Sequence, residues 1–223
     1  MKKSWILPGI FFLVAALVNW VTRLVAPELS ALVKPALMPL LALTTLAAAG
    51  TLEPRDMKLL IGAQLFGCAG DIFLIGSGVV ALGCGLGMFL TGHILYLNIF
   101  GARSWKGLGW KVWVPVVLVM ATIVFCLTRV IGINGVMLAP MFVYGMALML
   151  LIFSCLMGVI RLGGTTWWIL LAGAVIFTLS DCLVAAEVFD IHFPGIGFIV
   201  MFTYLVAQSL LAWGALRLIF KEK

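Results

Sequence analysis

Asp71 and Asp181 are acidic residues in segments that are otherwise apolar enough to lie in lipid. An ionisable side chain in the core of a bilayer is costly unless it faces a partner or a wet cavity, so such residues mark candidate sites of chemistry. Two carboxyl groups close together in surroundings of low dielectric cannot both ionise easily, and they then share one proton. We therefore predict that Asp71 and Asp181 form a catalytic acid and base pair.

Five further polar residues interrupt apolar segments, and we expect them to bind or orient a substrate beside the two aspartates. They are Lys34, His93, Tyr96, Tyr204 and Gln208. The histidine and the first tyrosine are three residues apart, and the second tyrosine and the glutamine are four apart. Each of these two pairs therefore shares one helix face. A polar cavity that opens towards the outer leaflet would collect all seven residues.

Each of these residues also has a purely structural interpretation. The aspartates could be structural carboxylates that pair with a lysine, and Lys34 could extend to the headgroups of the outer leaflet. A single buried histidine is more often a hydrogen-bonded structural residue than a ligand. Two acids at the same predicted depth, each after a small residue that permits close helix approach, favour function for Asp71 and Asp181.

Metal and thiol chemistry have little support in the sequence. A catalytic metal needs three or four ligands, and only His93 among the histidines is predicted to lie deep in the membrane. A metal would therefore have to be held mainly by Asp71 and Asp181, which is the less favoured alternative. The cysteines are scattered singly through apolar segments without a CxxC pair, which predicts neither a disulfide framework nor a sulfur-based zinc site. The sequence has no GxSxG motif for a serine nucleophile. We predict no metal and no cofactor.

The composition is that of an integral membrane protein. The chain of 223 residues is 65% hydrophobic and 10% charged, and its mean hydropathy of +1.26 is far above that of soluble domains. A span needs roughly 20 apolar residues, so this length holds about seven to nine spans. We predict a single membrane domain over residues 1–223. The basic residues fall in loops and termini, where they set topology, so no nucleic-acid partner is expected.

Charged residues and Gly or Pro punctuation divide the chain into eight predicted helices. Their ranges are 4–25, 29–49, 57–76, 80–101, 110–130, 134–160, 166–188 and 195–219. These helices predict an all-α, polytopic membrane protein. The sixth run is too long for a simple span, so we expect it to begin with an interfacial turn around Asn134 and Gly135.

The distribution of basic residues predicts the orientation. Eleven of them lie on the side of the N-terminus, namely Lys2, Lys3, Arg55, Lys58, Arg103, Lys106, Lys111, Arg161, Arg217, Lys221 and Lys223. Only Arg23 and Arg129 lie on the opposite side, and Lys34 is left out of the count because it is predicted to lie within the membrane. Both termini are therefore predicted to be cytoplasmic, in a bacterial inner membrane. Tryptophans near the predicted cytoplasmic helix ends are expected to form an aromatic belt; they are Trp105, Trp110, Trp113, Trp167 and Trp168.

The sequence shows signs of a weak internal repeat. Asp71 and Asp181 are 110 residues apart, about half of the chain, and each follows a small residue. Each also precedes a helix that carries two of the predicted orienting residues. The pattern is consistent with two parallel four-helix repeats and a site at their interface.

Five short motifs occur in order along the chain. They are Lys34-Pro35, Gly70-Asp71, the run from Phe89 to Tyr96 (FLTGHILY), Ser180-Asp181 and the run from Tyr204 to Gln208 (YLVAQ). Together they resemble the YhhN family, a group of multispanning membrane proteins that includes the lysoplasmalogenases and is known in animals as transmembrane protein 86. The resemblance covers nearly the whole chain. Val184 departs from it, because the family tends to have a larger aliphatic residue there.

The resemblance implies an eight-helix enzyme whose substrate is a lysophospholipid in membrane lipid. Lysoplasmalogenases hydrolyse the vinyl ether bond of 1-alkenyl-glycerophosphocholine or -ethanolamine to a fatty aldehyde and a glycerophospho-alcohol. Protonation of the alkene carbon gives an oxocarbenium ion that water captures, and glycosidases use two carboxylates around a similar state. The alternative is a transporter or lipid-binding protein in which the buried Lys, Asp and His residues form an ion or proton relay.

Overall fold

The computed structural model describes residues 3–221, and within this range the chain forms eight α-helices and no strand. The helices are α1 (Ile6–Val25), α2 (Pro27–Ala49), α3 (Arg55–Phe73), α4 (Val79–Ser104), α5 (Trp110–Ile131), α6 (Leu138–Arg161), α7 (Thr165–Val188) and α8 (Ile196–Lys221). The predicted all-α class is confirmed. A short 3-10 helix, η2 (Gly135–Met137), is the turn expected before α6, and η1 (Lys3–Trp5) precedes α1. Lys2 and Lys223, which the charge count includes, lie outside the described residues.

The chain is an integral, multi-pass membrane protein. Seven helices of the described range are long and apolar enough to cross a membrane. The eighth, α3, has 19 residues, but four of them are charged: Arg55, Asp56, Lys58 and Asp71. Large apolar side chains such as Leu7, Leu118 and Val130 are exposed along the outer helices. Such a surface fits lipid and not water. The orientation across the membrane stays a prediction.

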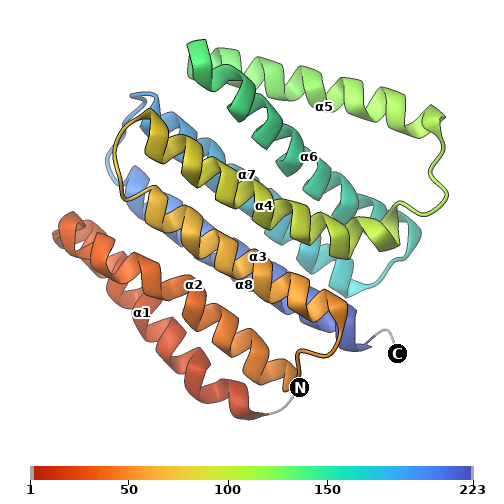
Figure 1. Cartoon of the computed structure of the whole chain (residues 1–223), viewed down its shortest axis with the longest axis horizontal. Helices are drawn as coiled ribbons and strands as arrows, with labels where there is room; N and C mark the ends of the chain where they lie inside the picture. The colour runs from red at the N-terminus through yellow and green to blue at the C-terminus, as the bar shows by residue number, and fades with distance from the viewer. Residues whose placement is uncertain (1–2, 222–223) are drawn as a thin grey trace.

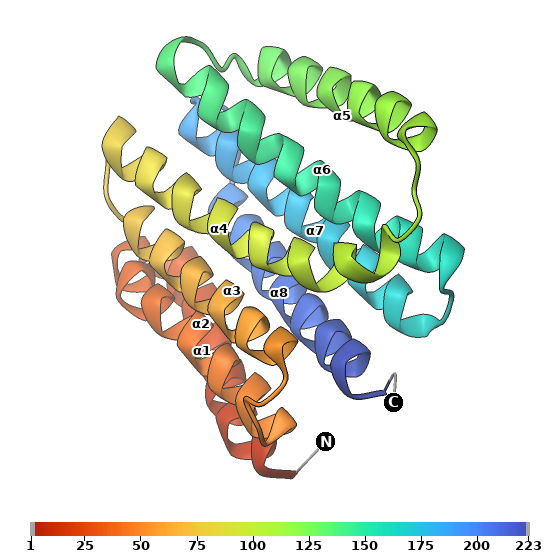
Figure 2. The same cartoon turned by 45° about the vertical axis from the view of Figure 1, so that its right-hand side comes forward.

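Helices α1 and α5 lie on opposite edges of the bundle (Figure 1). Helices α1 to α4 follow one another in space, and α6, α7 and α8 do the same, while α5 packs on α6. The two groups meet where α4 packs against α6 and where α8 packs against α1, α2 and α3. In Figure 2, α4 and α8 lie in the middle of the bundle, where the two groups meet. The candidate site lies at this junction.

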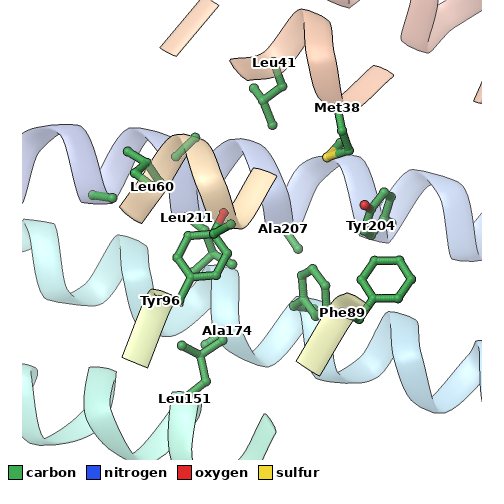
Figure 3. Packing of buried hydrophobic residues seen from close by; sticks show 14 of the residues in the cluster. Met38, Leu41, Leu60, Phe89, Tyr96, Leu151, Ala174, Tyr204, Ala207 and Leu211 are labelled. Carbon is green, nitrogen blue, oxygen red and sulfur yellow. The ribbon is translucent and has the colours of Figure 1, made fainter. Parts of the chain in front are cut away.

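Glycines permit the closest contacts of the core, and one of them corrects the predicted aromatic belt. A Cβ atom on Gly158 of α6 would lie 2.0 Å from Cε3 of Trp167, so this tryptophan packs directly on the α6 backbone. Trp167 is only 1% exposed and therefore does not belong to the belt, whereas Trp110 and Trp168 are exposed. Nearer the junction, Figure 3 shows Tyr204 of α8 between Met38 of α2 and Phe89 of α4.

Candidate active site

Asp71 is buried at the meeting point of three helices. Only 3% of the surface of Asp71 is exposed. The Nζ atom of Lys34 on α2 lies 3.2 Å from its Oδ1 atom, and the hydroxyl of Tyr204 on α8 donates a hydrogen bond of 2.8 Å to its Oδ2 atom. Each carboxylate oxygen of Asp71 therefore has a partner: the ammonium group of Lys34 contacts Oδ1, and the hydroxyl of Tyr204 contacts Oδ2. A cation beside a carboxylate favours its ionised form, so Lys34 opposes the effect of burial on Asp71.

The prolines of α2, the helix that carries Lys34, explain how this helix is tied to α3. Pro39 has no N–H, so the carbonyl of Pro35, one turn earlier, lacks its partner within the helix. The thiol of Cys68 on α3 donates to that carbonyl at 3.3 Å. Cys68 is one turn before Asp71, and Pro35 directly follows Lys34. The unusual hydrogen bond therefore ties the two helices together next to the ion pair.

Asp181 on α7 has a different set of partners. The hydroxyl of Tyr144 on α6 donates a hydrogen bond to its Oδ2 atom. The preceding residue, Ser180, donates its hydroxyl to the carbonyl of Val200 on α8 at 3.1 Å, which fixes α7 against α8 at this level. Asp181 is partly buried and lies beside a tyrosine instead of a lysine.

Both aspartates line one large cavity. It contains about 1010 Å³ of empty space, including the part that is open to the surroundings. Most of its wall is apolar, and its polar lining residues are Lys34, Asp71, Thr128, Tyr144, Thr178, Ser180, Asp181, Cys182 and Tyr204. Lys34 is the only basic side chain among the described residues of this wall. Such a cavity has room for a hydrocarbon chain beside a small polar region that contains one cation and two acids.

A row of rings connects the two tyrosines that hold the aspartates. The ring of Tyr204 lies 5.7 Å from that of Phe177, which lies 4.9 Å from the ring of His93. The His93 ring in turn lies 5.4 Å from that of Tyr144. The contacts between His93 and its neighbours are edge-to-face, a favourable geometry for aromatic rings. The tyrosines that bind the two aspartates are therefore linked by an unbroken series of ring contacts.

The predicted orienting residues divide between two cavities. Lys34 and Tyr204 line the large cavity together with the aspartates. His93, Tyr96 and Gln208 line a second, small cavity. There the hydroxyl of Tyr96 donates to Oε1 of Gln208 at 3.0 Å. The single cavity expected from the sequence is thus two cavities, and the roles of all seven residues stay predictions.

Tyr144 is the residue of the site that the sequence prediction missed. The chain has only three tyrosines, and all of them are buried: Tyr96, Tyr144 and Tyr204. Tyr144 lies 37 residues before Asp181, and Lys34 lies the same distance before Asp71. This equal spacing, combined with the suggested repeat of 110 residues, is the signal that could have pointed to Tyr144.

No metal site is evident in the part of the chain that the structure describes. Within it, no three His, Cys, Asp or Glu side chains come together in a way that could hold a metal ion. The donors that do line the large cavity include two carboxyl groups, two phenols and one lysine. Carboxyl groups take up and release protons, and phenols and ammonium groups donate hydrogen bonds to them. This set of groups suits acid and base chemistry.

Comparison with known proteins gives one family and several relatives. The model of the YhhN family matches residues 29–215. The mouse protein lysoplasmalogenase TMEM86B is 28% identical over 218 residues, which cover 96% of this chain and 88% of the mouse protein. The human protein of the same name is 30% identical over 161 residues, or 72% of this chain and 64% of its own length. The rat protein is 29% identical over 220 residues, or 96% of this chain and 85% of its own. No solved structure matches the chain.

Proposed function

This chain belongs to the YhhN family, and we propose that it hydrolyses the vinyl ether bond of lysoplasmalogens. The products are a fatty aldehyde and a glycerophospho-alcohol. The names of the mouse, human and rat relatives support this activity, and the rodent proteins align with nearly the whole chain. The predictions of an enzyme and of a lysophospholipid substrate are therefore kept as parts of this proposal.

The proposed mechanism is based on one observation. Asp71 and Asp181 line the same mainly apolar cavity, but their hydrogen-bonding and charged partners differ. Asp71 contacts Lys34 and Tyr204, whereas Asp181 contacts Tyr144. A lysophospholipid has a single hydrocarbon chain, which suits the apolar wall. Its vinyl ether bond and glycerol then lie beside the polar group of residues. Vinyl ether hydrolysis needs one acid in its protonated form and one in its ionised form, and the unequal partners support this division of labour.

In the first step Asp181 is the acid. Tyr144 occupies Oδ2 of Asp181, so Oδ1 carries the proton, which passes to the alkene carbon that is not bonded to oxygen. The π electrons of the double bond form the new C–H bond, and the positive charge is shared between the other alkene carbon and the ether oxygen. The ionised Asp71 stabilises this oxocarbenium ion, as carboxylates do in glycosidases.

In the second step Asp71 is the base. A water molecule adds to the oxocarbenium carbon and gives its proton to Asp71, which produces a hemiacetal. The hemiacetal collapses when its bond to the glycerol oxygen breaks. Asp71 returns its proton to that oxygen, and the hemiacetal hydroxyl gives its proton to Asp181. Both acids regain their starting forms, and one water molecule is consumed in each turnover.

Aldehyde release by the purified protein tests this function. Protein in detergent is incubated with a lysoplasmalogen, and aldehyde is measured by mass spectrometry, with the ester-linked lysophospholipid of the same chain length as the control substrate. We expect aldehyde from the vinyl ether alone. A protein that releases none in detergent, yet moves ions or lipid across a sealed vesicle, would be the transporter of the alternative interpretation.

A further inference from the structure

The small cavity contains a buried nitrogen that has no partner in the protein. His93 is 3% exposed, and its Nδ1 atom lies 2.7 Å from the carbonyl oxygen of Phe89. A carbonyl only accepts, so Nδ1 carries the hydrogen and Nε2 of the neutral ring is an acceptor. Nε2 is buried and has no hydrogen-bond partner among the described residues. A buried acceptor without a donor is costly, which points to a ligand that can donate.

The other polar groups of the small cavity complement such a donor. Tyr96 donates its hydrogen to Oε1 of Gln208, so its oxygen is able to accept a second hydrogen bond. The same bond orients the Gln208 amide, whose Nε2 atom is a donor beside Gly67. His93 and Tyr96 therefore offer acceptors and Gln208 offers a donor. Water has two hydrogens to donate and lone pairs to accept, so it is able to pair with groups of both kinds.

The size of the small cavity also fits water. The empty space in it is about 180 Å³, including the part that is open to its surroundings, which is room enough for water. A buried water needs polar partners, and His93, Tyr96 and Gln208 are the polar residues of this wall.

The small cavity adjoins the aspartate site. The side chain of Phe89 lines both cavities. Next to Gly67, the hydroxyl of Tyr204 and Nε2 of Gln208 lie 3.5 and 3.6 Å from the position of a Cβ atom, and that hydroxyl holds Asp71. The large cavity is mainly apolar, so a bound hydrocarbon chain excludes water from it. The reaction nevertheless needs one water in each turnover, and the small cavity beside it has three polar residues in its wall, His93, Tyr96 and Gln208.

We propose that the small cavity binds water through His93, Tyr96 and Gln208 and supplies the water that captures the oxocarbenium ion. This inference rests on the proposed function. The water moves past Phe89 and Tyr204 to the cation and gives its proton to Asp71 when the hemiacetal forms. His93 is then a positioning residue that acts through water and does not touch the lipid.

Gly67→Ala is the first test because it fills the water site and removes no polar group. The new methyl group meets its nearest neighbours at 3.5 Å or more, so it fits without strain. We expect kcat for aldehyde release to fall by about tenfold to a hundredfold, the size of effect that misplacing a reactant produces. KM for the lipid should stay within about twofold, because the chain binds in the other cavity. Gly87→Ala, on an exposed part of α4 with open space around it, is the matched control and should retain full kcat.

His93 provides an independent test with a conservative rescue. His93→Phe keeps the ring and removes Nε2, and we expect the same loss of kcat. His93→Gln places an amide oxygen near the lost acceptor, and we expect it to restore most of the rate. Melting temperatures in detergent verify that each variant is folded.

Full kcat in both Gly67→Ala and His93→Phe would overturn the water site, as would equal kcat in His93→Phe and His93→Gln. Absence of aldehyde with the wild-type protein is a different failure, because it would refute the proposed hydrolysis. In that case an experimental structure that resolves water still decides the matter. A water within hydrogen-bonding distance of His93 Nε2 and Gln208 Nε2 would support the site, and a dry cavity would overturn it.

Discussion

Lys34 and Tyr144 each lie 37 residues before the aspartate that they contact, on helices that occupy the second place in the two halves of the chain. The two acids therefore have equivalent positions but different partners. Lysine forms an ion pair with Asp71, whereas tyrosine supplies only a hydrogen bond to Asp181. This relationship supports the suggested internal repeat. In the proposed mechanism this difference between the partners lets one acid be ionised while the other is protonated.

Replacing the lysine should test this asymmetry. In Lys34→Met, Asp71 loses its cation and with it the reason to stay ionised. We expect aldehyde release to fall by about a hundredfold, within the range for loss of a catalytic base. Lys34→Arg keeps the charge and should retain much more activity, although the geometry of guanidinium differs from that of ammonium. Steady-state kinetics in detergent measure both. Normal turnover in Lys34→Met would assign the lysine to the headgroup region and not to catalysis.

The aspartates themselves should be individually essential. Asp71→Asn and Asp181→Asn keep the shape of each side chain and remove its acid and base function. We expect each to lower kcat by at least about a hundredfold. The double variant should be scarcely slower than either single one, because residues that act as a unit are not additive. Elution as a monodisperse peak and an unchanged melting temperature serve as controls for folding. Wild-type activity in either single variant would refute the pair.

The helices were predictable because charge, glycine and proline mark their ends in an otherwise apolar chain. α5 is an example: its predicted range ends at residue 130, and the helix ends at Ile131, before Gly132 with its left-handed φ of 83°. The buried acids were visible for the same reason, since each is rare in its surroundings. Periodicity did not help there, because the buried helices are apolar on every face.

The rotation of each helix about its axis could not be read from the sequence. In the sequence, Tyr144 is one aromatic residue within an apolar run. Only the packing of α6 against α7 shows that its hydroxyl contacts Asp181. His93 and Tyr204 were both predicted to lie beside the aspartates. In the structure Tyr204 contacts Asp71, whereas His93 lines the small cavity. Trp167 lies at a helix end, as a belt residue would, but the missing side chain of Gly158 lets it pack inside. These details depend on packing between helices that are far apart in the chain.

Stability should depend strongly on the contact between Gly158 and Trp167. In Gly158→Ala the added methyl group would lie 2.0 Å from a fully buried, rigid indole ring, so α6 and α7 must move apart. Overpacking of this kind typically costs about 1–3 kcal/mol. We expect the melting temperature in detergent to fall by about 5 °C, as such a cost predicts for a chain of this size. Gly87→Ala should melt like the wild type, and a Gly158→Ala protein that did so too would show that this interface is loosely packed.

The apolar wall of the large cavity should determine how tightly the lipid binds. Val184 lies on this wall, one turn after Asp181 on α7. In Val184→Trp the larger side chain takes the place of part of the hydrocarbon chain. Loss of contact for about two methylene groups costs about 1.5 kcal/mol, which corresponds to roughly a tenfold rise in KM. Val175→Trp makes the same change on the same helix at an exposed position outside this wall, and KM should not change there. Equal KM values in the two variants would mean that the chain of the lipid binds elsewhere, and the acids would then need a different substrate.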